Sequence, residues 1–129
     1  MIRKFIRSRI KSFGYAFSGW WYVTRTQQNA WIHALASVVV LLVSIWLRIS
    51  RIEWALIIIA VAMVWTAEFL NTALEVVVDL ATKEHHPLAK VSKDVGAAAV
   101  LIASLTAILI GVVILGPPFI NKIRTLFFP

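Results

Sequence analysis

Four polar residues fall at helical spacing in an otherwise apolar stretch of the chain: Glu68, Asn71, Glu75 and Asp79. At about 100° per residue, Glu75 and Asp79 lie about 20° to either side of Glu68. Asn71 lies within about 60° of the same line, so all four side chains share one stripe. Because an ionised carboxylate near the centre of a membrane helix costs about 2.5–3.5 kcal/mol on insertion scales, we expect the stripe to face other helices, water or bound cations.

The residue types in this stripe indicate a particular chemistry. Two glutamates seven residues apart, with an amide between them, suit a hard cation such as magnesium and a nearby proton acceptor. The alternative is an intramembrane polar network that only joins helices. Two glutamates and an aspartate carry more charge than such a network requires, and we therefore favour a functional site at the boundary between hydrocarbon and cytoplasm.

A polar loop follows the stripe. The segment 83–87 (KEHHP) leads to Lys90, Lys93 and Asp94 at the start of a further apolar run. Cations beside a helix N-terminus can hold phosphate groups, although a loop with three lysines, taken alone, is more often a solvated connector. His33 stands alone near the start of an earlier apolar run, and we interpret it as an interfacial histidine whose hydrogen bonds are satisfied.

The elements that position these residues are predicted to be membrane helices. The chain has 129 residues, of which 60% are hydrophobic and 15% charged, and its mean hydropathy is +0.85. A soluble domain of this size could not bury so much apolar surface. The apolar runs 30–47, 54–78 and 95–116 approach the roughly 20 residues that cross a bilayer, and we expect Pro117-Pro118 to stop the third. We predict an all-α membrane protein.

Residues 1–28 form a basic and aromatic segment. Its apolar side chains recur at helical spacing and its basic ones lie largely on the other side, which predicts an amphipathic surface helix. A positively charged topogenic stretch with no further role is the alternative.

The distribution of basic residues predicts the orientation in the membrane. The first 25 residues and the 79–94 loop carry nine Lys and Arg residues, whereas the 48–53 turn and the C-terminal tail carry four. The positive-inside rule then places the N-terminus and the second loop in the cytoplasm. We attribute the net charge of +7 to attraction for anionic lipid headgroups and expect no nucleic-acid partner.

Three segments together resemble a known family. They are GYAFSG at 14–19, EFLNTALEVVVD at 68–79 and HPLAKVSKD at 86–94. Over roughly residues 10–116 the chain resembles the prokaryotic diacylglycerol kinase and undecaprenol kinase family. The segment HPLAK at 86–90 is more similar to the undecaprenol kinase branch.

The resemblance implies one lipid kinase domain over residues 1–129, in a homotrimer with active sites at subunit interfaces. Such an enzyme lies in the cytoplasmic membrane of a prokaryote and transfers the γ-phosphate of ATP to the hydroxyl of a membrane lipid with the help of Mg²⁺. Undecaprenol is the preferred acceptor and diacylglycerol the alternative. A non-catalytic membrane accessory protein with the same fold remains a third possibility.

The resemblance also implies roles for individual residues. Glu68 corresponds to the catalytic carboxylate, Asn71 and Asp79 support it, and Glu75 corresponds to a magnesium ligand. The implied ATP contacts are Tyr15, Gln27, Glu75, Glu84, His85, His86, Lys93 and Asp94.

Two positions depart from the family pattern. Gln27 stands where the family has a second metal-binding glutamate; its amide carbonyl can ligate magnesium but brings no charge. Ser8 stands where some members place a nucleotide-contacting arginine. The chain has no GxxxxGK[ST] loop, so any nucleotide binds without that standard phosphate cradle.

Overall fold

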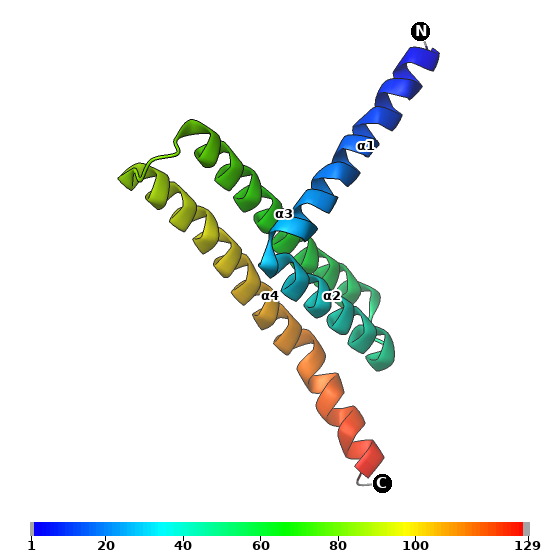
Figure 1. Cartoon of the computed structure of the whole chain (residues 1–129). Coiled ribbons are helices and arrows are strands. Elements are labelled where there is room, and N and C mark those ends of the chain that lie inside the picture. The colour runs from blue at the N-terminus through cyan, green and yellow to red at the C-terminus, as the bar shows by residue number, and fades with distance from the viewer. Residues whose placement is uncertain (1, 128–129) are drawn as a thin grey trace.

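The computed structural model describes residues 2–127, which form four helices (Figure 1). They are α1 (Ile2–Thr26), α2 (Gln28–Leu47), α3 (Arg51–Ala81) and α4 (Pro87–Phe127). The predicted all-α class is confirmed. Helices α2, α3 and α4 are each long and apolar enough to cross a membrane, so the chain is a multi-pass membrane protein.

The turn between α2 and α3 is short because both helix ends are capped. Arg48 ends α2 in the left-handed conformation at φ 54°, and its backbone N–H bonds back into the last turn. Ser50 and Glu53 form a reciprocal capping box, in which the Ser50 N–H donates to Glu53 Oε2 at 2.6 Å. Helix α3 therefore begins at Arg51, three residues before the predicted span.

Helices α3 and α4 run side by side along most of α3 (Figure 1). Their close approach depends on Gly96 of α4, which is buried. A Cβ atom at this position would collide with Oδ1 of Asn71 on α3. The absence of a side chain at Gly96 thus leaves room for an amide of the polar stripe between the two helices.

Helix α4 corrects the expectation that Pro117-Pro118 stops the third apolar helix. The helix continues through both prolines to Phe127. Proline removes backbone hydrogen bonds, but membrane helices tolerate it where neighbouring groups hold the backbone. Here Lys122 Nζ donates to the Trp46 carbonyl at 2.7 Å and lies 4.8 Å from the centre of the Trp46 ring, and Phe119 packs edge-on against that ring at 6.0 Å.

Helix α1 is attached to the other helices only near its C-terminal end. Val23 is its one buried residue, and Trp20 stacks on Trp65 of α3 with ring centres 4.8 Å apart. After α1, Gln27 adopts an extended conformation and breaks the helix before α2 begins. The N-terminal part of α1 consequently projects away from the other three helices (Figure 1).

The fit of Asn71 over Gly96 leads to a first prediction. Gly96→Ala should force Asn71 to move or α3 and α4 to separate, at a cost of about 1–3 kcal/mol. We expect a melting temperature several degrees lower for the purified protein in detergent, measured by intrinsic fluorescence. Gly111→Ala is the matched control, because a Cβ there meets no atom within 4 Å and alanine favours the helix. Equal melting of the two variants would contradict the proposed close approach.

Candidate functional site

The polar stripe of α3 passes from the interior of the helix bundle to its surface. Glu68 and Asn71 are buried, Glu75 is half-buried and Asp79 is exposed. At about 1.5 Å per residue, Glu68 lies about 10 Å from Glu75 and about 16 Å from Asp79 along the axis. The stripe therefore runs from a buried inner end at Glu68 to an exposed outer end at Asp79, beside the α3–α4 loop.

Glu68 marks the inner end. Its side chain is 1% exposed, and neither carboxylate oxygen has a hydrogen-bond partner among the described residues. The nearest ionisable side chain is that of His33 on α2, whose Nε2 lies 3.6 Å from Glu68 Oε2. That nitrogen is also buried without a hydrogen bond. The interpretation of His33 as a satisfied interfacial histidine is therefore wrong.

The middle of the stripe is a hydrogen-bonded trio. The Glu75 carboxylate accepts a bond from Gln27 Nε2 at 3.1 Å and a second from Asn71 Nδ2 at 3.0 Å. Gln27 and Glu75 are 48 residues apart in the chain and meet because α1 ends beside α3. The two residues that the resemblance implies as metal ligands thus face each other within one chain.

The outer end of the stripe opens on a polar cavity of about 530 Å³ at the α3–α4 loop. Asp79 and Lys93 form an ion pair across its wall, with 2.6 Å between Oδ1 and Nζ. The cavity is lined by Val78, Asp79, Thr82, Lys83, Glu84, His85, His86, Ala89, Lys90 and Lys93. It brings together four of the residues predicted to contact ATP, and adds Lys83 and Lys90, which the predicted set lacks.

Two predicted ATP contacts lie elsewhere. Tyr15 is 74% exposed on α1, and lies eight residues, or about 12 Å of helix, before Val23, where α1 packs on the bundle. Asp94 is exposed and is not part of the cavity wall. It follows Lys93 directly, so it points about 100° away around α4.

Comparison with known proteins identifies the family. The profile of the prokaryotic diacylglycerol kinase family matches residues 14–115. The chain belongs to this family. It is 41% identical to the undecaprenol kinase of Bacillus subtilis over 83% of this chain and 87% of that protein. It is 40% identical to a diacylglycerol kinase of Synechocystis over 85% and 63%, and 37% identical to that of Escherichia coli over 85% and 90%. The resemblance seen in the sequence is confirmed, and the chain is a lipid kinase by class.

A metal site in this lipid kinase would have few protein ligands. The described residues contain no group of three or more His, Cys, Asp and Glu side chains suited to a cation. Gln27 and Glu75 nevertheless fit magnesium, because that ion usually takes one or two protein oxygens and keeps water and phosphate for the rest. With its amide turned over, Gln27 would present Oε1 instead of Nε2 to a cation held by Glu75.

This pairing generates a second prediction. Gln27→Glu would place two carboxylates against each other, so without metal the variant should melt at a lower temperature than the wild type. Added Mg²⁺ should then raise its melting temperature by more than it raises that of the wild type. We also expect the magnesium concentration for half-maximal kinase activity to fall roughly three- to tenfold, which corresponds to about 0.7–1.4 kcal/mol.

Gln28→Glu is the control for this experiment, since it adds the same charge one residue away at an exposed position. If both variants respond to magnesium alike, Gln27 does not face the cation. The metal would then depend on Glu75 and the phosphates alone.

Proposed function

We propose that this chain is a magnesium-dependent kinase that transfers the γ-phosphate of ATP to the hydroxyl of a membrane lipid alcohol, with undecaprenol as the preferred acceptor. The observation that carries the proposal is the course of the α3 stripe. It leads from a buried carboxylate at Glu68, which has no hydrogen-bond partner among the described residues, to a lysine-lined cavity at the α3–α4 loop. A nucleotide that binds in the cavity can extend its triphosphate along the stripe toward Glu68, where it would meet the hydroxyl of a lipid.

The proposed mechanism assigns each part of the stripe a task. Glu68 accepts the proton of the lipid hydroxyl as its oxygen attacks the γ-phosphorus. Lys83, Lys90 and Lys93 hold phosphate oxygens near the start of α4. Glu75 and Gln27 would hold magnesium, which would supply positive charge against the phosphate oxygens. Phosphoryl transfer depends mainly on such positioning and charge neutralisation.

The choice of acceptor rests on similarity. The undecaprenol kinase of Bacillus subtilis and the HPLAK segment at 86–90 support a polyprenyl alcohol. Diacylglycerol is the second candidate, because the other reported relatives are named diacylglycerol kinases.

We also propose that the enzyme is a homotrimer whose sites lie between subunits. Within one chain, Tyr15 is not part of the wall of the loop cavity, and α1 projects away from the other three helices. A second copy can receive the projecting α1 and complete the nucleotide site. In this arrangement α1 lies at the membrane surface, where its exposed Phe5, Ile6 and Phe13 contact lipid.

The proposed orientation in the cytoplasmic membrane follows the basic residues, with the N-terminus and the α3–α4 loop in the cytoplasm. This orientation gives the loop cavity access to cytosolic ATP.

The proposal is tested with purified protein in micelles, labelled ATP, and undecaprenol and diacylglycerol offered in parallel. The wild type should phosphorylate undecaprenol faster, and Glu68→Gln should lose about 10²-fold or more in kcat because it cannot accept the proton. Glu53→Gln, at the other end of α3, is the matched control, since glutamine preserves the capping box. Normal turnover by Glu68→Gln would remove Glu68 from the mechanism, and absence of lipid phosphate from the wild type would refute the function.

The orientation has its own test in a chain without cysteine. Ser8→Cys and Thr125→Cys place single thiols at exposed positions near the two ends and leave every basic residue in place. In intact cells a membrane-impermeant thiol reagent should label Thr125→Cys, and should label Ser8→Cys only after permeabilisation. The opposite pattern would invert the topology and separate the loop from cytosolic ATP.

A further inference from the structure

The ionisable groups that meet deepest among the helices are Glu68 and His33, which come from α3 and α2. Burying polar atoms without hydrogen bonds is unfavourable, yet both Glu68 oxygens and His33 Nε2 lack a hydrogen-bond partner among the described residues. The 3.6 Å between His33 Nε2 and Glu68 Oε2 is slightly longer than a formed hydrogen bond. Catalytic hydrogen bonds are often this long before substrate binds and tighten in the complex.

The imidazole of His33 is held in place by its neighbours. Trp65 of α3 lies edge-on to the ring with centres 6.4 Å apart, and its indole N–H donates to Ser37 Oγ at 3.2 Å. Ser37 in turn donates to the backbone carbonyl of His33 at 2.7 Å. Trp65 is itself stacked on Trp20 of α1. Three helices thus fix the position of a ring whose Nε2 faces Glu68.

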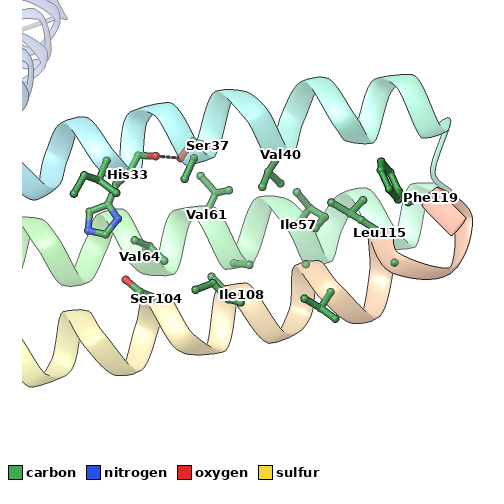
Figure 2. Close-up of a pocket in the computed structure, with 17 residues that line it drawn as sticks. His33, Ser37, Val40, Ile57, Val61, Val64, Ser104, Ile108, Leu115 and Phe119 are labelled. Atoms are coloured by element: carbon green, nitrogen blue, oxygen red, sulfur yellow. Dashed lines mark hydrogen bonds between the residues drawn. The ribbon is translucent and has the colours of Figure 1, made fainter. Parts of the chain in front are cut away.

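His33 also lies at one end of an apolar cavity of about 580 Å³ between α2, α3 and α4 (Figure 2). The wall of this cavity is otherwise almost wholly aliphatic, and its other polar side chains are the hydroxyls of Ser37 and Ser104. Figure 2 shows the imidazole extending from α2 into the space between the helices. Among the described residues that line this wall, His33 is the only one with an acidic or basic side chain.

We infer that His33 is a positioning residue for Glu68 and the next acceptor of the proton that Glu68 takes from the lipid hydroxyl. The inference rests on the proposed function. The lipid oxygen forms its bond to the γ-phosphorus as the bond from that phosphorus to the β,γ-bridging oxygen breaks and ADP leaves. The hydroxyl proton passes to a Glu68 oxygen and then to His33 Nε2, which leaves an imidazolium beside a carboxylate.

The chemistry of the two groups explains the order of transfer. A carboxylic acid left at Glu68 could not accept the proton of the next lipid hydroxyl, whereas transfer to His33 Nε2, 3.6 Å away, returns Glu68 to the carboxylate form. The His33 side chain is 14% exposed, against 1% for Glu68, so the proton leaves the site through the histidine.

Three variants test the inference in the undecaprenol assay. In His33→Ala, kcat should fall about 10- to 100-fold while the KM values for ATP and lipid stay within about twofold. Added imidazole should enter the enlarged cavity and restore at least a third of the lost rate. His33→Gln can donate a hydrogen bond but cannot take the proton, so it should be slow and should not respond to imidazole. Ser104→Ala, which removes a hydroxyl from the same wall, is the control and should retain wild-type kcat.

The outcomes separate this inference from the proposed function. Wild-type kcat in His33→Ala or His33→Gln, with Glu68→Gln inactive, would overturn the role of His33 and leave the kinase mechanism standing. Failure of the wild type to phosphorylate either lipid would instead refute the function. If His33→Ala does not fold, as judged by melting in detergent, the kcat of His33→Gln decides, because its side chain still fills the site.

Discussion

The structure depends on one constraint, which is the placement of a carboxylate among apolar helices at Glu68. A charge in this position is tolerated only where other protein groups surround it. The surrounding groups come from more than one helix. Helix α2 supplies an imidazole, and α1 covers this region with Trp20 stacked on Trp65. The bundle is therefore organised around a polar group that a purely structural membrane helix would exclude.

Burial along α3 changes in step with the chemistry proposed for it. Glu68 is enclosed, Glu75 is half-buried and held by two amides, and Asp79 is exposed and paired with a lysine. Each carboxylate therefore has a different kind of partner. Glu68 lies beside an imidazole, Glu75 accepts hydrogen bonds from two neutral amides, and Asp79 pairs with a lysine. This change in burial along the stripe suits a reaction between a substrate dissolved in lipid and one dissolved in water. The inner end of the stripe is buried among apolar helices, and its outer end is exposed.

Much of this arrangement could be predicted from the sequence, because helical periodicity and hydropathy act locally. The three apolar helices and the common face of Glu68 and Glu75 follow from spacing alone. The partnership of His33 with Glu68 does not, because it joins α2 to α3 across 35 positions of sequence and no local pattern encodes it. A signal was nevertheless present: a buried carboxylate needs a partner, and His33 is the only titratable residue in the first apolar run.

The end of α4 was hidden for the same reason. Two adjacent prolines are a local stop signal, whereas the contacts of Lys122 with Trp46, which attach the end of α4 to α2, join residues far apart in the sequence. At these positions tertiary contacts override the intrinsic helix propensity of the residues. The extended backbone of Gln27 likewise depends on where α1 is fastened rather than on its own residue type.

Gln27 is both the joint between α1 and α2 and the amide that contacts Glu75. Any rotation of α1 relative to the bundle must therefore move that amide against the carboxylate. Helix α1 has 25 residues and packs on the bundle only near its C-terminal end, so a change in its tilt would reach the Glu75 side chain through Gln27. The orientation of α1 and the geometry of the Gln27–Glu75 contact are therefore coupled through one residue.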